Sequence, residues 1–160
     1  MPEPLITWHG EVPSEWTDYN GHLRDAFYLL IFSYATDGFM EHIGLGEAQR
    51  ETSGHSLFTL ECHLNFLHEV HQGAEVAVHT QLLACDHKRV QLYHSLHIKG
   101  ETLTLAASEQ MLLHVALDGP KAVPFQDSMA AHLADLARQH SKGPKPEWTG
   151  RMIGMPKAIK

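Results

Sequence analysis

The sequence predicts an α+β fold in which one antiparallel sheet of about five strands wraps around a single long helix. Three observations predict it. A helical apolar periodicity runs through residues 26–43, four alternating segments follow between residues 56 and 117, and no helical segment separates those four. Strands joined by short turns pair antiparallel, and a long apolar helix needs a sheet that covers it.

The first two elements are a short strand and the long helix. Residues 5–12 are typical of a strand that ends at Pro13. From Ala26, apolar residues recur at helical spacing and form one face, which comprises Phe27, Leu30, Ile31, Tyr34, Ala35, Gly38, Phe39, His42 and Ile43. The opposite face also carries apolar side chains, so we expect burial on more than one side (Leu29, Phe32, Met40). Gly44 predicts the helix end, and residues 44–56 predict a loop.

Four strands follow, and each is expected to place alternate side chains on one face. In the first strand the predicted face comprises Phe58, Leu60, Cys62, Leu64 and Phe66. In the second it comprises Val76, Val78, Thr80 and Leu82, and in the third it comprises Val90, Leu92, His94, Leu96 and Ile98. Residues 102–117 predict the fourth strand.

The C-terminal part predicts a short amphipathic helix over residues 127–140, begun by Asp127 or Ser128, and an extended tail over residues 141–160. The whole order is that of a hot-dog fold in a single domain spanning residues 1–160. An open sheet edge is commonly closed by pairing across a two-fold axis, so we expect a homodimer at least. A homotetramer would use the same strands, and the sequence does not separate the two.

Composition and charge argue against several classes of function. The net charge is −7 with neutral histidines, which argues against nucleic acid as a partner. The N-terminus has no basic segment followed by an apolar run, and no apolar run approaches the length of about 18 residues that a membrane helix needs. The two cysteines, Cys62 and Cys85, have no paired metal spacing and fit a reducing compartment. We expect a soluble cytoplasmic protein that contacts no membrane.

The 14 histidines raise the question of a metal site. Zinc ligands usually occur at short, regular spacings on a helix or a turn, whereas these histidines are scattered over predicted strands. His94 and His97 are three residues apart, which places them on opposite faces of a strand. We therefore predict no metal.

The segment before the long helix carries the candidate chemistry. Asp18 lies in the loop that leads into the helix, whose N-terminus offers unpaired N–H groups and a positive dipole end. Those N–H groups could polarise a carbonyl oxygen while the carboxylate attacks the carbonyl carbon or activates water. Gly21 would let the backbone come close to a substrate. The alternative is structural: Asp18 and Asn20 form a turn, and Asp25 caps the helix.

The segment DYNGHLRDAFY, residues 18–28, resembles the motif of the 4-hydroxybenzoyl-CoA thioesterase family of hot-dog proteins. The match covers Asp18, Gly21, His22, Leu23 and Tyr28, and the element order is similar to about residue 125. The resemblance implies that Asp18 is the catalytic carboxylate and that the backbone N–H near Asp25 polarises the thioester carbonyl. Arg24 and Asp25 stand where that family usually has two asparagines.

Two further segments resemble parts of such proteins. Residues 84–97 are similar to the strand pair whose basic turn meets the nucleotide end of coenzyme A, which would assign Lys88 and Arg89 to the phosphates, although both would equally suit a solvated turn. Residues 66–73 and 106–115 resemble the betainyl-CoA thioesterase subgroup associated with carnitine breakdown. No cofactor is implied, since coenzyme A is part of the substrate.

The predicted function is hydrolysis of a small acyl-CoA to the free acid and CoA, with betainyl-CoA as one such substrate. The candidate catalytic residues are Asp18, Asn20, His22 and Asp25, with His22 orienting the loop. The candidate substrate-binding residues are Gly21, Arg24, Tyr28, Ser56, Thr59, Lys88 and Arg89.

A betainyl group would place a quaternary ammonium beside the thioester, and aromatic faces with a nearby carboxylate hold such cations. The available aromatic residues are Trp8, Trp16, Tyr19, Phe27, Phe66 and Tyr93, and the acids are Glu61 and Glu69, although aromatics near such a helix are more often core. Two other functions stay open. One is a hot-dog enoyl-CoA hydratase, whose Asp-x-Asn-Pro-x-His pattern Asp18, Asn20 and His22 partly match. The other is a non-catalytic acyl-CoA-binding protein.

Overall fold

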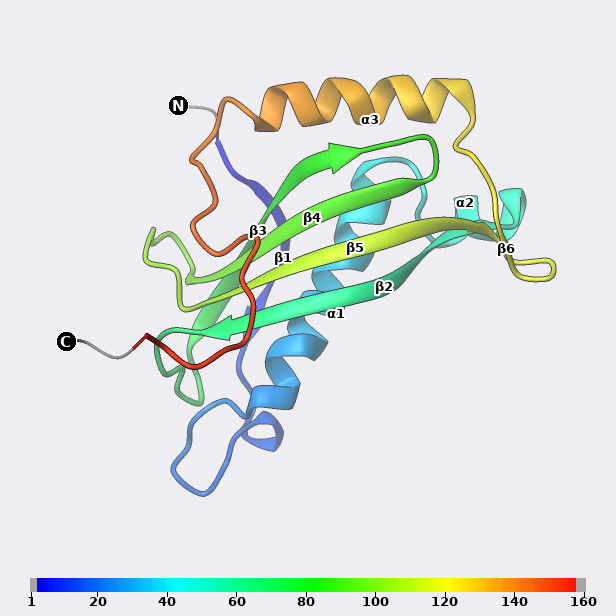
Figure 1. The fold of residues 1–160 in the computed structure, drawn as a ribbon. Helices are drawn as coiled ribbons and strands as arrows, with labels where there is room; N and C mark the ends of the chain where they lie inside the picture. Colours follow the sequence, from blue (N-terminus) through cyan, green and yellow to red (C-terminus); the bar gives the residue numbers. More distant parts are fainter. Residues whose placement is uncertain (1–2, 158–160) are drawn as a thin grey trace.

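The computed structural model describes residues 3–157 and has the predicted α+β hot-dog architecture, with a curled antiparallel sheet and the long helix α1 (Asp25–His42) against one face (Figure 1). The strand order is β1-β3-β4-β5-β2, and a short sixth strand pairs with β5. The strands are β1 (Leu5–Glu11), β2 (His55–Phe66), β3 (Glu75–Cys85), β4 (Arg89–Ile98), β5 (Ala106–Ala116) and β6 (Lys121–Ala122). The sequence did not predict β6.

The helix α1 is buried along a stripe that differs from the predicted face. The stripe comprises Tyr28, Ile31, Phe32, Ala35, Thr36, Phe39 and Met40. The prediction that α1 is buried on more than one side is wrong, because Phe32 and Met40 belong to this same stripe and Leu29 is exposed. Tyr34 and His42 of the predicted face are exposed as well. Gly38 lies where α1 crosses β1, and a Cβ there would collide with the carbonyl oxygen of Thr7. The close crossing explains why part of the helix surface needs no large side chain.

The prediction of a loop over residues 44–56 is wrong, because a short helix, α2 (Glu47–Ser53), lies within it. The glycines and serines that favoured a loop flank the helix rather than interrupt it. Gly46 is its N-cap, and Gly54 ends it in the left-handed conformation with φ 70°. Between them lie residues such as Ala48 and Arg50, which favour helix.

The face predicted for the first long strand is also wrong in its first half, because β2 contains a bulge. Thr59 pairs with Leu112 and Glu61 with Met111, so Leu60 is an extra residue. The extra residue reverses the alternation on its N-terminal side. Phe58 and Leu60 are therefore exposed, at 40% and 57%, although the sequence placed both of them in the core. The predicted faces of β3 and β4 are confirmed, and Val76, Val78, Val90 and Leu92 among others are fully buried.

A core hydrogen-bond network, comprising Thr7, Thr80, His94, Thr36 and Gln110, crosses the sheet beneath α1. His94 Nδ1 lies 2.7 Å from Thr80 Oγ1, and its Nε2 lies 3.0 Å from Thr36 Oγ1. Thr80 in turn meets Thr7, and Thr36 meets Gln110. Burial of His94 lowers its pKa to about 3, so its ring is neutral at neutral pH. Each polar atom in the network has a partner, which makes it structural.

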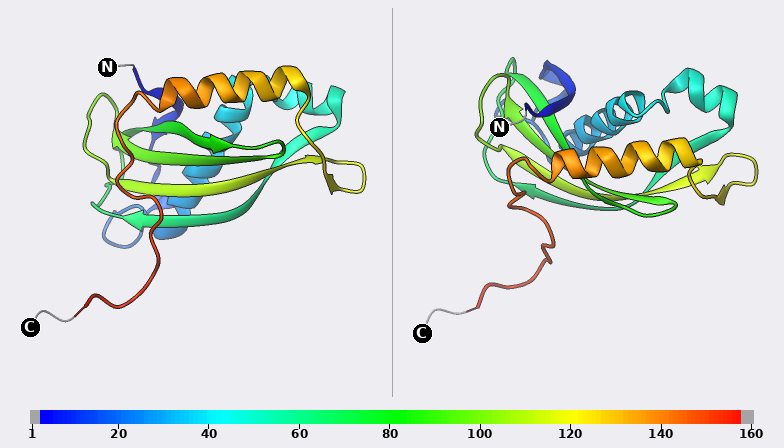
Figure 2. Two further views of the ribbon diagram at one scale, coloured as in Figure 1. Left: turned by 45° about the horizontal axis from the view of Figure 1, so that its top comes forward. Right: turned by 90° about the horizontal axis from the view of Figure 1, so that it is seen from above.

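The helix α3 (Asp127–His140) has the predicted bounds and lies along β3, and two of its leucines join the core (Leu133, Leu136) (Figure 1). Gln126, rather than Asp127 or Ser128, is its N-cap. Over residues 141–157 the tail has no regular secondary structure and crosses the sheet on the face away from α1 (Figure 2), and the last residues of the predicted extended tail lie outside the described residues. The backbone N–H of Gly150 fixes it to Glu109 at 2.9 Å. No helix within residues 3–157 is long and apolar enough to span a membrane.

Candidate active site

The Asp18 carboxylate is held in place by its own loop. Its Oδ1 accepts hydrogen bonds from the backbone N–H groups of Asn20, at 2.8 Å, and His22, at 3.1 Å. The bond from His22 is the main cause of a pKa below the ordinary aspartate value, which partial desolvation opposes. The side chain is partly exposed, and Oδ2 accepts no hydrogen bond from any residue that the structure describes. Asp18 therefore combines the predicted turn role with an ionised oxygen that is free to react.

The loop is anchored to the connection between β2 and β3. Gly21 has φ 74°, a left-handed conformation that glycine adopts without strain, and its carbonyl oxygen accepts a hydrogen bond from Gln72 N–H at 2.9 Å. The N–H of Leu23 donates to Val70 O at 2.7 Å. Backbone bonds therefore fix the position of Asp18, and the Asn20 side chain makes no hydrogen bond to any residue between 3 and 157.

The start of α1 provides an unpaired donor close to that loop. Arg24 is the N-cap, and its N–H donates to Trp16 O at 2.9 Å. The side chain of Asp25 accepts from Ala26 N–H at 2.8 Å, but the backbone N–H of Asp25 has no acceptor among residues 3–157. An unpaired N–H at the positive end of a helix can stabilise an oxyanion. The backbone N–H of Asp25 is therefore available for the role that the sequence predicts for it.

A hollow of about 280 Å³ opens beside this helix start, lined by His22, Leu23, Asp25, Tyr28, Phe66, Leu67, His68 and Glu69. The rings of Tyr28 and Phe66 meet edge to face, with centroids 5.0 Å apart. Burial, and to a lesser extent the Glu69 carboxylate, raises the pKa of Tyr28, so this phenol stays protonated. The hollow therefore brings together three of the predicted site residues, His22, Asp25 and Tyr28. Asp18 does not line it but is bonded to the backbone N–H of His22, which does.

His22 also belongs to a cluster of three metal-ligating side chains. Its Nε2 lies 3.4 Å from Glu69 Oε2, and its ring meets the His71 ring edge on at 4.7 Å. One ligand atom from each of the three lies within 4.8 Å of the others. The residue types and spacing would suit a zinc ion with an open position. His22 and Glu69 also lie close enough to form an ion pair when the imidazole is protonated, so the same cluster can orient the loop without an ion.

The predicted phosphate-binding residues do not lie near Asp18 within one protomer. Lys88 directly precedes β4 and Arg89 begins it, whereas the Asp18 loop lies at the other end of that strand, roughly 30 Å away at about 3.3 Å per residue. Arg89 is paired with Asp86 at 2.7 Å, and Asp86 also accepts from the Lys88 N–H. These bonds lower the pKa of Asp86 to about 2, with the Lys88 backbone bond first among the causes.

Ser56 and Thr59 lie at that distant end as well. Phe58, between them, pairs with Leu113, and Leu113 pairs with Arg89 on the other side. Ser56 is buried and Thr59 is exposed. One protomer therefore separates the predicted residues into two groups at opposite ends of the sheet.

Sequence reasoning underestimates the segment that forms the second wall of the hollow. It names Phe66 and Glu69 only among the aromatic and acidic residues that could hold a cation, and it does not distinguish His68 and His71 from the other scattered histidines. The available signal was the clustering of two histidines and an acid directly after a strand and before Gly73. Polar ionisable residues concentrated in a connection point to function more than the same residues within a strand do.

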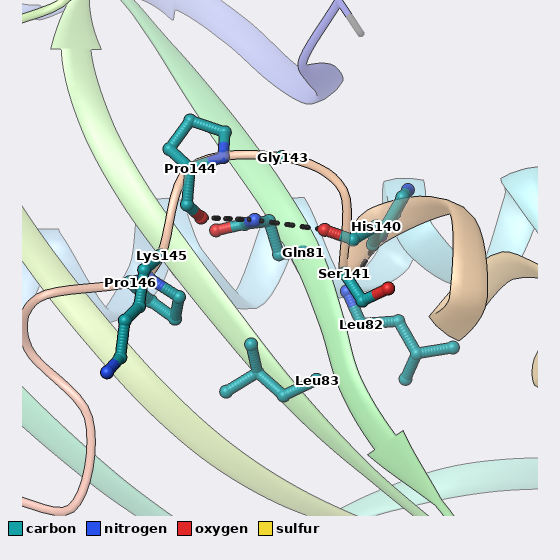
Figure 3. A pocket seen from close by; sticks show the side chains of 9 residues that line it. All are labelled: Gln81, Leu82, Leu83, His140, Ser141, Gly143, Pro144, Lys145 and Pro146. Atoms are coloured by element: carbon teal, nitrogen blue, oxygen red, sulfur yellow. Dashed lines mark hydrogen bonds between the residues drawn. The ribbon is translucent and has the colours of Figure 1, made fainter. Parts of the chain in front are cut away.

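A second hollow, of about 270 Å³, lies between β3 and the start of the tail (Figure 3). The amide of Gln81 donates to Pro144 O at 2.9 Å, and the N–H of Leu82 donates to His140 Nδ1 at 2.8 Å. These bonds hold the end of α3 and the tail against the sheet. The pocket contains no carboxylate, so it serves as an anchor and lacks the groups that the first hollow offers.

Comparison with known proteins agrees with this geometry. The sequence model of the thioesterase-like superfamily matches residues 12–133. A betainyl-CoA thioesterase of Pseudomonas aeruginosa is 58% identical over 156 residues, covering 98% of each chain. The structure of a candidate thioesterase from Pseudomonas putida has a TM-score of 0.85 at 51% identity, covering 98% of this chain and 99% of that one. A Staphylococcus aureus protein solved with CoA has the same TM-score at 28% identity, with coverage of 98% and 99%.

Proposed function

Because the chain belongs to the thioesterase-like superfamily, we propose that it hydrolyses betainyl-CoA, a small cationic acyl-CoA, to betaine and CoA. One observation carries the proposal: the backbone fixes the ionised Asp18 in the loop that leads directly into the unpaired N–H of Asp25, in a chain 58% identical to a betainyl-CoA thioesterase. The carboxylate and the oxyanion donor are the two groups that thioester hydrolysis requires.

In the proposed reaction the thioester carbonyl oxygen accepts a hydrogen bond from the Asp25 N–H at the start of α1. Asp18 then either attacks the carbonyl carbon or takes a proton from the water that attacks it. In both routes the C–S bond breaks, the acyl carbon gains a hydroxyl from water, and CoA leaves as the thiol after taking up a proton. His22 positions Asp18 through its backbone N–H, and the imidazole orients the loop through Glu69. A thioester is already activated, so the reaction uses no redox cofactor and CoA enters only as substrate.

We infer that a second copy of the chain completes the site. The strand β2 is an open edge with two exposed apolar residues, Phe58 and Leu60, and such an edge favours pairing. Antiparallel pairing of two β2 edges places the start of one strand beside the end of the other. The second copy's Ser56, Thr59, Lys88 and Arg89 would then approach the Asp18 end, where the two cations could meet the nucleotide phosphates. Light scattering should give at least a dimeric mass.

The hydratase alternative conflicts with the loop conformation. The hydratase pattern has proline where this chain has Gly21, and Gly21 has φ 74°, which a proline ring cannot adopt. Two free cysteines, Cys62 and Cys85, support a reducing compartment, and we propose the cytoplasm.

The test is a panel of acyl-CoA esters assayed by release of the free thiol of CoA. The panel contains betainyl-CoA, 4-hydroxybenzoyl-CoA and a neutral short-chain ester, with crotonyl-CoA followed by loss of enoyl absorbance. We expect betainyl-CoA to have the highest kcat/KM and crotonyl-CoA not to be hydrated. Faster turnover of a neutral ester would reject betainyl-CoA as the substrate. Binding without turnover of any ester would leave only an acyl-CoA-binding protein.

A further inference from the structure

The structure separates the aromatic residues that could hold a quaternary ammonium from those that cannot. Trp8, Trp16 and Phe27 stack in sequence on one another at the side of the core, with centroids 6.3 and 5.8 Å apart. Tyr19 is 92% exposed on the loop, and Tyr93 is buried on β4, away from the Asp18 loop. Phe66 alone among the six candidates lines the hollow beside α1, where it meets Tyr28. An aromatic pair therefore stands next to the proposed reaction centre.

Apart from the histidines, the ionisable side chains around that hollow are acidic and carry negative charge. The carboxylates of Asp25 and Glu69 line it, and no lysine or arginine of the described chain does so. The Glu69 side chain is 71% exposed and has His22 as its ion-pair partner, so it can turn toward a bound cation. Two carboxylates next to a pair of aromatic rings form an environment that favours a cation over a neutral group of the same shape.

The position and size of the hollow fit a betainyl group. Asp25 belongs both to the lining of the hollow and to the oxyanion donor. In betainyl-CoA a single methylene separates the carbonyl carbon from the trimethylammonium nitrogen, so the cation must lie next to the oxyanion donor. The volume of about 280 Å³ lies just below the usual range for small-molecule pockets, which is about 300 to 1,000 Å³, and so suits a compact acyl group.

We propose that Phe66, Tyr28 and Glu69 form the subsite for the trimethylammonium head of the acyl group, and that this subsite sets the substrate preference. The inference rests on the proposed function, because it assumes that the acyl group is cationic. Phe66, which is 51% exposed, presents its ring to the cation, Tyr28 holds that ring edge to face, and Glu69 supplies the opposite charge.

The test compares betainyl-CoA with its neutral isostere, 3,3-dimethylbutyryl-CoA, in which a carbon replaces the ammonium nitrogen. The measured quantity is the ratio of the two kcat/KM values, normalised to wild type so that the intrinsic reactivity of the two esters cancels. Glu69→Gln and Phe66→Leu should each lower this ratio about three- to tenfold, mainly through KM for betainyl-CoA. Phe66→Tyr, which keeps the ring, should leave it within about twofold. Glu51→Gln, which removes an exposed charge on α2, is the matched control and should not change it.

A second measurement needs no variant. Choline and its neutral isostere 3,3-dimethylbutan-1-ol are tested as inhibitors of the wild-type enzyme, and choline should inhibit at a lower concentration. A wild-type preference for betainyl-CoA that survives both Glu69→Gln and Phe66→Leu would overturn the subsite but leave the proposed function standing. If wild type hydrolyses the two esters equally well and choline does not inhibit preferentially, the betainyl assignment and the subsite both fail, while hydrolysis of acyl-CoA remains.

Discussion

The core hydrogen-bond network around His94 and the Asp18 loop both hold a titratable side chain with two hydrogen bonds. They differ in what remains unpaired. Both ring nitrogens of His94 have partners, and the side chain is fully buried. Asp18 has one paired oxygen and is partly exposed, and the Asp25 N–H nearby has no acceptor in the described chain. In this histidine-rich protein, a cluster of titratable side chains is therefore a weak indicator of function. Hydrogen-bonding groups left unpaired at the start of a helix are a better indicator.

The largest expected effect comes from Asp18→Asn. The amide keeps an oxygen that can accept from Asn20 and His22 but has no charge, so kcat should fall about 10²- to 10⁴-fold. The midpoint of urea unfolding should change little, since the loop keeps its bonds. Thiol release and circular dichroism measure the two quantities. Near-normal turnover in this variant would show that the carboxylate is only part of a turn.

The reverse pattern is expected for His94→Leu. Thr80 and Thr36 each lose one buried partner, and an unsatisfied buried group costs about 1–3 kcal/mol, so the free energy of unfolding should fall by about 2 kcal/mol. The folded fraction should keep its kcat, because His94 lies away from the hollow. A selective loss of kcat in a variant of unchanged stability would mean that the core network takes part in the reaction.

As the pH falls, the protein should lose folding stability before Asp18 loses its charge. Burial lowers the pKa of His94 to about 3 and that of His79 to about 4, the latter aided by the adjacent His97. Unfolded histidines titrate near about 6.5, so the unfolded chain binds more protons below that pH. The contribution of these two neutral histidines to the free energy of unfolding is fully present above about pH 6.5. It is lost as the pH falls toward their folded-state pKa values.

The measurement is the urea midpoint at about pH 7.5 and about pH 5, together with activity at both. Asp18 has a lowered pKa and stays ionised over this range, so activity should decline only as far as the protein unfolds. His94→Leu should show a weaker pH dependence of stability than wild type. A reversible loss of activity at about pH 5 with full retention of structure would contradict this order of events.

The smallest effect is expected from metal removal. The proposed reaction uses no ion at the His22, Glu69 and His71 cluster, so EDTA followed by desalting should leave kcat unchanged within error. If EDTA lowers kcat, and zinc restores it in wild type but not in His71→Ala, the cluster would instead bind a metal. His71→Ala without EDTA serves as the control for its structural role in the loop.

Regular elements were predictable where a local pattern decided them. The helix α3 has the predicted bounds, and the side chains predicted for the inner face of β3 and β4 are mostly buried, as at Val76 and Leu92. The helix α2 was missed because glycines at its ends look like loop residues until their cap roles are known. The stripe of α1 was misassigned because apolar residues occur almost all round it, and only the packing of β1 and the sheet decides which ones face inward.

The site was predictable as far as it is local. Asp18, Gly21, His22 and Asp25 lie within one short segment, so the motif and the helix start were enough to propose them together. Phe66 and Glu69 reach the hollow only because the connection after β2 folds back against α1, and no sequence spacing encodes that contact. Residues such as Arg89 lie at the opposite end of the sheet, and their predicted role depends on a second copy of the chain.

The bulge at Leu60 has a consequence for the evolution of this strand. The alternation changes phase at Leu60, so Leu57 and Cys62 point to the same side although they are an odd number of positions apart along the chain. Loss of the single residue Leu60 in a descendant would close the bulge and leave every other residue of β2 opposite its present partner on β5. Deletion of this residue should therefore be tolerated better than deletions elsewhere in the strand, and substitution patterns should change phase at this one position.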